Sequence, residues 1–276
     1  MTPTRPLLRY HGGKWRLAPW IISHFPAHRT YTESFGGAGS VLLRKERAYA
    51  EVYNDLDGEV VNLFRVLRNP AEARELIRQV RLTPYARAEF DASYILADDP
   101  IEQARRMLFR SAAGFSSTGA SGKWRTGFRG NVTRSGTTPA HDWQILPNAL
   151  QLIVERLQGV VIECAPAIDV ICTYDGPTAL HYVDPPYVAS TRYLRWAGEA
   201  YKHEMTDEQH RELAAVLHSV KGAVVLSGYA CPLYDELYGD WLSVTKFTHA
   251  DGAKDREETL WMNRPNRTLF DFEDDE

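Results

Sequence analysis

The sequence predicts an α/β fold, in which short buried strands alternate with helices. An apolar run at Ala179–Val183 indicates one buried strand. A second strand is expected at Thr30–Phe35, and a glycine-rich turn follows it directly. Ser40 is placed to cap a helix from Val41 to about Arg47. The 276 residues are 44% hydrophobic and 25% charged, which is typical of a globular protein with one large domain or one domain carrying an insertion.

Neither a membrane segment nor a metal site is expected from the composition. No apolar run approaches the roughly 20 residues that a membrane span needs, and residues 1–10 lack the apolar segment of a signal peptide. The three cysteines, Cys164, Cys172 and Cys231, show no Cys-x-x-Cys spacing, so we expect reduced core residues. We therefore expect a cytoplasmic protein that needs no metal.

Charge is unevenly distributed along the chain. The net charge is −4, which argues weakly against a polyanionic partner. From Gln103 to His141, however, there is no Asp or Glu, and seven Lys and Arg residues give this segment a local charge of +7. A segregated basic segment in an acidic protein is a candidate surface for binding phosphates.

A pair of glycines precedes Lys14 near the start of the chain. The segment differs from a phosphate-binding loop because Trp15 stands where Ser or Thr is required. The glycines let the backbone approach a ligand, with Tyr10 and Lys14 as candidate contacts. The alternative is a flexible lead-in to a helix at Trp15–His24.

The glycine-rich turn after the Thr30–Phe35 strand contains Phe35, Gly37 and Gly39 in the spacing Phe-x-Gly-x-Gly. A strand, a glycine turn and a capped helix give a nucleotide-like ligand close contact with the backbone. The dinucleotide spacing Gly-x-Gly-x-x-Gly is absent, because Leu42 occupies the third position. That absence counts against a nucleotide-dependent oxidoreductase, and a plain tight turn stays as the alternative.

Asp55 follows a second short strand, Ala50–Tyr53. An acidic residue at this place can accept hydrogen bonds from both ribose hydroxyls of a nucleotide-like ligand. It can also cap the helix expected at Asp57–Leu67. The two roles are compatible.

Helices and a basic segment fill the middle of the chain. Helices are expected at Pro70–Val80, Pro84–Leu96 and Pro100–Phe115, because each begins near a proline. The next segment, Ser116–Asn131, is rich in Gly and Ser and interleaves basic with aromatic residues. It can lie along a nucleic-acid backbone, and a disordered surface loop is the alternative. The candidate nucleic-acid contacts are Arg110, Lys123, Trp124, Arg125, Arg129 and Arg134.

The last part of the chain returns to alternating helices and strands. Thr206 is expected to cap a helix that continues to Val220. Further helices are expected at Pro147–Leu157 and Ala167–Cys172, and further strands at Val160–Glu163, Val224–Leu226, Trp241–Phe247 and Thr259–Met262.

The strand Ala179–Val183 ends in Asp184-Pro185-Pro186-Tyr187. Two prolines stop the strand, so Asp184 stands at the carboxyl edge of the sheet, where ligands bind in open α/β folds. The loop offers a carboxylate, backbone carbonyls and one aromatic ring, a set that suits a flat ring bearing an amino group. The alternative is a simple turn, since Asp and Pro are common there.

Taken in order, these motifs resemble the Dam-type DNA adenine-N6 methyltransferases, including their phage and prophage members. The similarity covers roughly Leu7 to Asn263. It rests mainly on Tyr-x-Gly-Gly-Lys at Tyr10–Lys14, on the glycine loop at Phe35–Gly39 and on Asp-Pro-Pro-Tyr at Asp184–Tyr187. The segment Glu257–Trp261 also resembles phage members.

The resemblance implies an S-adenosylmethionine-dependent methyltransferase fold, with a seven-stranded, mostly parallel sheet and helices on both faces. It implies a catalytic domain at residues 1–66 and 148–276 and a mainly helical target-recognition insertion at residues 67–147. The insertion departs from members that read GATC, so the target sequence does not carry over. The implied contacts of S-adenosylmethionine are Tyr10, Lys14, Phe35, Gly37, Gly39, Asp55 and Asp184.

The expected activity is methyl transfer to N6 of an adenine flipped out of double-stranded DNA, without an obligate protein partner and in a bacterial or phage setting. Asp184 and the Pro185 carbonyl would accept the amino N–H groups, and Pro186 and Tyr187 would complete the pocket, with the base stacked on Tyr187. Methylation of N4 of cytosine, methylation of adenine in RNA, and a catalytically silent DNA-binding relative remain alternatives. Pairing with a restriction nuclease is left open.

Overall fold

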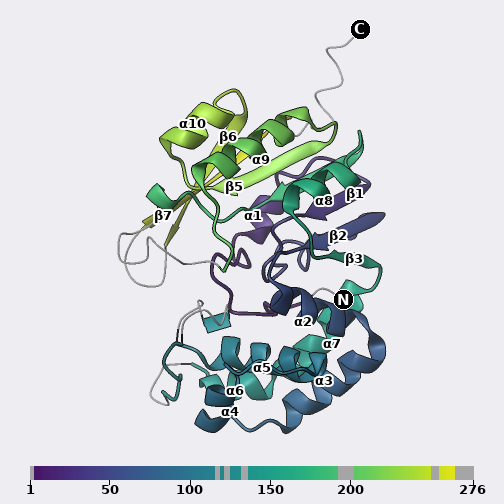
Figure 1. Ribbon diagram of the computed structural model, residues 1–276, viewed down its shortest axis with the longest axis vertical. Helices are drawn as coiled ribbons and strands as arrows, with labels where there is room; N and C mark the ends of the chain where they lie inside the picture. The colour runs from purple at the N-terminus through teal and green to yellow at the C-terminus, as the bar shows by residue number, and fades with distance from the viewer. Residues whose placement is uncertain are drawn as a thin grey trace.

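The structure is a computed structural model, and it describes residues 3–115, 119–120, 125–131, 136–191, 202–249 and 255–264. Within these residues, seven strands form one sheet in the order β3-β2-β1-β4-β5-β7-β6 (Figure 1). Among the pairs, only those of β7 with β5 and with β6 are antiparallel. This confirms the predicted mostly parallel, seven-stranded sheet. The strands are β1 (Thr30–Glu33), β2 (Ala50–Asn54), β3 (Val160–Glu163), β4 (Ala179–Val183), β5 (Ala223–Gly228), β6 (Leu242–His249) and β7 (Asp255–Met262).

The carboxyl ends of β1 and β4 meet at the middle of the sheet. The two strands are paired in parallel, from Thr30 opposite Ala179 to Glu33 opposite Tyr182. The strand order reverses between them, because the chain goes from β1 to β2 on one side and from β4 to β5 on the other. Ligands of open α/β sheets bind at such a switch point, so Asp184 leaves β4 at the place where a site is expected.

Alternate side chains of the central strands enter two different apolar cores. Tyr182 of β4 and Val225 of β5 pack on one face, and their neighbours Val183 and Leu226 pack on the other. This alternation follows from the two-residue repeat of a strand. Both faces are therefore covered, and β4 is buried throughout, as its apolar sequence predicts.

Helices cover both faces of the sheet and also form a separate bundle (Figure 1). The second core is built with α8 (Ala167–Tyr174), α9 (Asp207–Ser219) and α10 (Pro232–Tyr238). The helix α1 (Ala18–Ile22) packs into the first core. The remaining α-helices gather in the lower half of Figure 1 and join the first core. They are α2 (Gly58–Arg68), α3 (Pro70–Leu82), α4 (Arg87–Ala92), α5 (Pro100–Ala113), α6 (Pro139–Gln144) and α7 (Leu146–Leu157), and a 3₁₀ turn, η2, spans Ala189–Thr191.

The predicted helix from Val41 to about Arg47 is wrong, because this segment forms turns. The carbonyl of Leu42 accepts a hydrogen bond from Arg156 at 2.7 Å, so it is not paired along a helix. The hydroxyl of Ser40, the expected cap, is buried and has no hydrogen-bond partner among the described residues. Contacts to α7 therefore override the local preference for a helix.

A buried ion network fixes these turns against the sheet. Glu51 of β2 accepts from both guanidinium nitrogens of Arg156, at 2.6 and 2.8 Å, and from Lys45 at 2.8 Å. All three side chains are at most 5% exposed. Because the pairing is bidentate and nearly dry, it has the geometry that a buried ion pair needs to offset its desolvation. The network holds the turn, β2 and α7 together below the glycine loop.

Candidate active site

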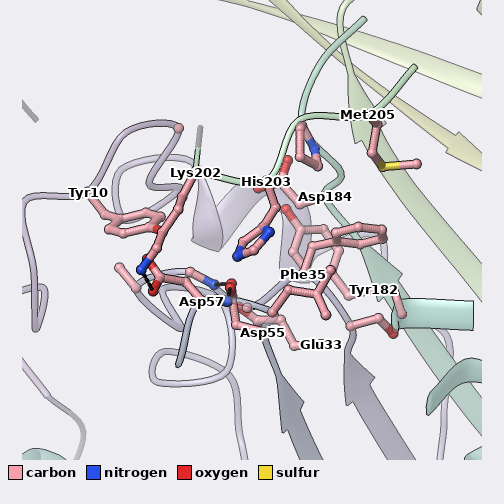
Figure 2. A pocket seen from close by; sticks show the side chains of 18 of the residues that line it. Tyr10, Glu33, Phe35, Asp55, Asp57, Tyr182, Asp184, Lys202, His203 and Met205 are labelled. Atoms are coloured by element: carbon pink, nitrogen blue, oxygen red, sulfur yellow. Dashed lines mark hydrogen bonds and ion pairs between the residues drawn. The ribbon is translucent and has the colours of Figure 1, made fainter. Parts of the chain in front are cut away.

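A cavity of about 300 Å³ lies where β1, β2 and β4 end. Its lining includes most of the residues that the sequence marks as candidate ligand contacts (Figure 2). The structure thus brings together parts of the chain that are up to 203 residues apart, from Tyr10 to Leu213. The candidates that line it are Tyr10, Lys14, Phe35, Gly37, Asp55, Asp184 and Pro186.

The glycine loop is packed too closely to accept side chains. A Cβ atom added at Gly36 would lie 2.2 Å from the ring of Tyr53, and one at Gly39 would lie 2.9 Å from the ring of Phe64. Gly37 and Gly39 also have φ angles of 48° and 61°, which disfavour other residues. Gly39 packs against the ring of Phe64 and does not line the cavity. The loop can therefore present bare backbone to a ligand.

Asp55 is held rigidly at the floor of the cavity. Its carboxylate accepts hydrogen bonds from the backbone N–H groups of Gly37 and Asp57, each at 2.7 Å. Burial raises the pKa of Asp55 above its ordinary value, while these two donors act in the opposite direction. The cap of α2 is Asp57, whose carboxylate accepts from the N–H of Glu59 at 3.0 Å, so Asp55 is not needed for that role.

Glu33 is a cavity residue that the sequence reasoning missed. It ends β1, is 3% exposed and lines the cavity. Its Oε2 accepts from the hydroxyl of Tyr31 at 2.8 Å and from the N–H of Leu42 at 2.7 Å. Burial raises the pKa of Glu33 to about 8. The available signal was an acidic residue at the end of a strand that leads into a glycine loop.

Asp184 combines burial with strong hydrogen bonding. Its Oδ1 lies 3.0 Å from Nζ of Lys14 and accepts from the hydroxyl of Ser227 at 2.9 Å. Burial raises the pKa of Asp184, and the nearby ammonium of Lys14 lowers it. The carboxylate is thus fixed in the cavity wall with a defined orientation.

Lys14 and Tyr187 form a buried cluster with Glu258 of β7. The Lys14 ammonium donates to the Tyr187 hydroxyl and to the carbonyl of Gly12. The Tyr187 hydroxyl donates to Oε1 of Glu258, which lies 3.4 Å from Nζ of Lys14. The sequence marked Tyr187 as a stacking surface, and the structure places its ring at 6% exposure beside Tyr229. That stacking role stays a prediction, as does the role of the buried Pro185.

A second group of cavity residues was also missed, because its contacts join distant parts of the chain. Lys202 lies 2.8 Å from Asp57 and 3.4 Å from Glu59, and the Asp57 contact spans 145 residues. His203 and Met205 belong to the same wall, and Figure 2 shows His203 pointing into the cavity. No local pattern in the sequence marks such pairs.

The candidate nucleic-acid contacts fall into four groups. Arg110 is 2% exposed and donates to the carbonyls of Ser93, Gly119 and Ala120 at 2.8 to 3.0 Å, so it is a structural residue and does not face solvent. This corrects its assignment to the phosphate-binding surface. Arg125 is exposed, next to Asp91. Three candidates, Lys123, Trp124 and Arg134, lie outside the described residues.

Arg129 is intermediate in burial between the buried Arg110 and the exposed Arg125. Its side chain is partly buried and donates to the carbonyl of Ala112 at 3.1 Å. The neighbouring Phe128 packs against Tyr85 and Phe90 in the bundle. The described part of the basic segment is thus anchored to the helices α4 and α5.

Metal ligation and membrane insertion have no structural signature in the described ranges. No group of three or more His, Cys, Asp or Glu side chains among these residues is arranged to hold a metal ion. No helix among them is long and apolar enough to cross a membrane.

The strand order with an antiparallel β7, together with the cavity at its switch point, defines an S-adenosylmethionine-dependent methyltransferase fold. The family described as D12 class N6 adenine-specific DNA methyltransferase matches residues 10–250, and the chain belongs to this family. The protein is therefore a methyltransferase that acts at specific sites on N6 of adenine in DNA.

Bacterial relatives resemble most of the chain. It is 24% identical over 254 residues to a DNA adenine methylase of Salmonella typhi, which covers 86% of this chain and 85% of that one. The DNA adenine methylase of Escherichia coli (strain K12) is 24% identical over 224 residues, or 78% and 76% of the two chains. A DNA adenine methylase of Vibrio cholerae is 23% identical over 212 residues, or 73% of each chain.

Proposed function

We propose that the protein transfers the methyl group of S-adenosylmethionine, bound in the cavity at β1 and β4, to an adenine rotated out of double-stranded DNA. The observation that carries this proposal is the placement of Asp184 in the cavity wall, fixed by Lys14 and Ser227. The reaction would take place in the bacterial cytoplasm and would need no obligate protein partner.

The lining of the cavity fits this methyl donor. Its volume of about 300 Å³ suits a small ligand. Its lysines, Lys14 and Lys202, are outnumbered by the carboxylates of Asp55, Asp57, Asp184, Glu204 and Glu212, a balance that favours a cation. Asp55, held by two N–H donors, is placed to accept from ribose hydroxyls. When bound, S-adenosylmethionine supplies an electrophilic methyl group on a positively charged sulfur and leaves as a neutral thioether.

Asp184 would activate the target amino group. The lone pair of N6 is delocalised into the adenine ring, so it attacks poorly without help. Asp184 and the Pro185 carbonyl would accept the two N–H groups, which favours a tetrahedral nitrogen with a free lone pair. As the N–C bond forms, one proton moves from N6 to Asp184. Positioning and fixed charges supply most of the rate enhancement in such an arrangement, and Pro186 and Tyr187 would complete the pocket.

Residues 67–147 would recognise the target DNA, while residues 1–66 and 148–276 carry out the chemistry. The four basic residues between Lys123 and Arg134 support this assignment. Arg105, Arg106 and Arg110 do not, because they pair with the acidic residues Glu89, Glu102 and Glu59. Lys123, Arg125, Arg129 and Arg134 would hold phosphates, and Trp124 would stack on a base. The structure adds Phe115, which is 71% exposed at the end of α5 and offers a further stacking surface.

A direct test is incubation of the protein with labelled S-adenosylmethionine and, separately, duplex DNA, single-stranded DNA and RNA. We expect N6-methyladenine as the labelled product, mostly from the duplex, when the nucleic acid is digested and analysed by mass spectrometry. Label confined to RNA or to N4 of cytosine would overturn the proposal. A parallel thermal-shift assay should show stabilisation by S-adenosylhomocysteine and none by NAD.

A further inference from the structure

Behind the cavity wall lies a cluster of one cation and two carboxylates. The ammonium of Lys14 is 5% exposed and lies 3.0 Å from Asp184 and 3.4 Å from Glu258. Only Lys14 and Asp184 of these three line the cavity. Glu258 is 4% exposed and is not among the residues that line the cavity.

Glu258 reaches this cluster because of the direction of β7. In the antiparallel pairing of β6 with β7, Glu258 stands opposite Lys246 and its neighbour Glu257 stands opposite Phe247. Successive side chains of a strand point to opposite faces. Glu258 is consequently buried behind Tyr187, while Glu257 is exposed to solvent. The two adjacent carboxylates of β7 thus occupy very different environments.

The contacts form a chain from β7 to the cavity. Glu258 accepts a hydrogen bond from the Tyr187 hydroxyl, and the oxygen of that hydroxyl accepts one from Lys14. Lys14 in turn donates to Asp184. Glu258, Tyr187 and Lys14 are buried, and the side chain of Asp184 is only 16% exposed, so the electrostatic interactions are weakly screened and the geometry is restrained.

We propose that Glu258 is a positioning residue for methyl transfer, which fixes Tyr187 and Lys14 and through them orients the carboxylate of Asp184 toward the target amino group. The proposal rests on the role proposed above for Asp184. Without the charge of Glu258, the Tyr187 hydroxyl, which also interacts with Asp184, is held by a weaker acceptor, and Lys14 loses one of the carboxylates beside it. A reacting group displaced by about 1 Å can lower the rate about 100-fold.

The Glu258 charge also affects proton binding by Asp184. Two like charges that share one cation raise each other's pKa, so removing the charge of Glu258 should lower the pKa of Asp184. The acid limb of the pH–rate profile would then move to lower pH. The other titratable or charged groups that face Asp184 are not changed chemically in such a variant, and they are Lys14, Glu33, Tyr182 and Tyr187.

The test compares Glu258→Gln with Glu257→Gln, which removes a charge from the exposed neighbour. Both full-length variants are mixed with S-adenosylmethionine and duplex DNA, and the rate of a single turnover is measured between pH 5 and pH 9. For Glu258→Gln we expect a rate about 100-fold lower that persists at saturating S-adenosylmethionine and DNA, and an acid limb at lower pH. Glu257→Gln should match the wild type.

A crystal structure of Glu258→Gln gives a readout that does not depend on activity, and it should show Lys14 or Asp184 displaced. A wild-type rate and pH profile in a folded Glu258→Gln protein would overturn the proposal. If that variant does not fold, Tyr187→Phe removes only the connecting hydroxyl and should reproduce the loss of rate. An unchanged rate in Tyr187→Phe would equally contradict it.

A further variant distinguishes an error in the role of Glu258 from an error in the proposed role of Asp184. Asp184→Asn is assayed in the same series. If Asp184→Asn is inactive while Glu258→Gln is normal, Asp184 keeps its role and the positioning by Glu258 is refuted. If Asp184→Asn is also normal, the proposed mechanism itself is wrong.

Discussion

Glu33 is a buried carboxyl group at the end of β1, next to the space proposed for the cofactor. Its pKa, about 8, is high because burial disfavours the charged form. At neutral pH the group is therefore mostly protonated in the folded protein and ionised in the unfolded chain. This difference connects the protonation of a single residue with the stability of the whole fold.

We predict that Glu33 makes the stability of the protein fall as the pH rises. The stability that the fold has with Glu33 protonated is complete below about pH 4.5, the ordinary pKa of this side chain. It is lost progressively up to about pH 8, the pKa of Glu33 in the folded protein. Glu33→Gln stays neutral at every pH. In urea unfolding, the variant should gain stability relative to the wild type between pH 5 and pH 8, by about a few kcal/mol at most. If the free energies of unfolding of the variant and the wild type differ by the same amount at pH 5 and at pH 8, this prediction is contradicted.

Individual site residues were predictable where short motifs mark them. Asp55 and Asp184 were found because each directly follows a strand, and the structure places both in the cavity. Glu258 and Lys202 received no functional assignment, because their significance arises from ion pairs with residues more than 100 positions away. Sequence reasoning of this kind finds side chains at strand ends more readily than pairs formed by tertiary packing.

At the scale of elements, α5 connects α2 with the described residues that follow it in the chain. Arg110 of α5 reaches the carbonyls of Gly119 and Ala120 and lies 3.4 Å from Glu59 of α2. Glu59 also lies 3.4 Å from Lys202 in the cavity wall. The helix α5 thus anchors the described part of the basic segment close to the proposed cofactor site.

We predict opposite consequences for two arginines of this region. Arg110→Ala removes a buried cation and its hydrogen bonds, so it should lower the free energy of unfolding by about 3–5 kcal/mol. Arg125→Ala removes an exposed cation and should change the free energy of unfolding by less than about 1 kcal/mol, while weakening DNA binding. Urea unfolding and fluorescence anisotropy with labelled duplex DNA measure the two effects. A stable Arg110→Ala protein would contradict the structural role.

Elements were predicted well where local signals decide their limits. Thr206 caps α9 as expected and forms a capping box with Gln209, and β3 and β4 match their predicted bounds. The helix expected at Val41–Arg47 failed because Arg156 of α7 binds the carbonyl of Leu42. The helices α6 and α10 were not anticipated, since both are short and lack strong periodicity.

At the scale of the whole molecule, charge is separated. The protein has a net charge of −4, yet the segment from Gln103 to His141 carries +7. Phosphate binding by such a segment releases counterions and makes affinity depend steeply on salt. The seven-stranded, mostly parallel sheet was implied by the family resemblance. The order of its strands was not predicted, because neither composition nor periodicity specifies which strands are neighbours.

We predict that the triple variant Lys123→Ala, Arg125→Ala, Arg129→Ala binds all DNA sequences more weakly. The slope of log K against log salt concentration should decrease by about 0.9 for each phosphate that the variant no longer neutralises. Binding titrations on duplexes of unrelated sequence at several salt concentrations measure this slope. An unchanged slope would exclude these three side chains as phosphate ligands.

The central claim is that Asp184 activates the target amino group in a cavity that holds the methyl donor. The most direct measurement is a single-turnover assay of Asp184→Asn preloaded with labelled S-adenosylmethionine. We predict that the variant binds the donor and duplex DNA but transfers the methyl group at least about 100-fold more slowly. Transfer at the wild-type rate by a folded Asp184→Asn protein would contradict the claim.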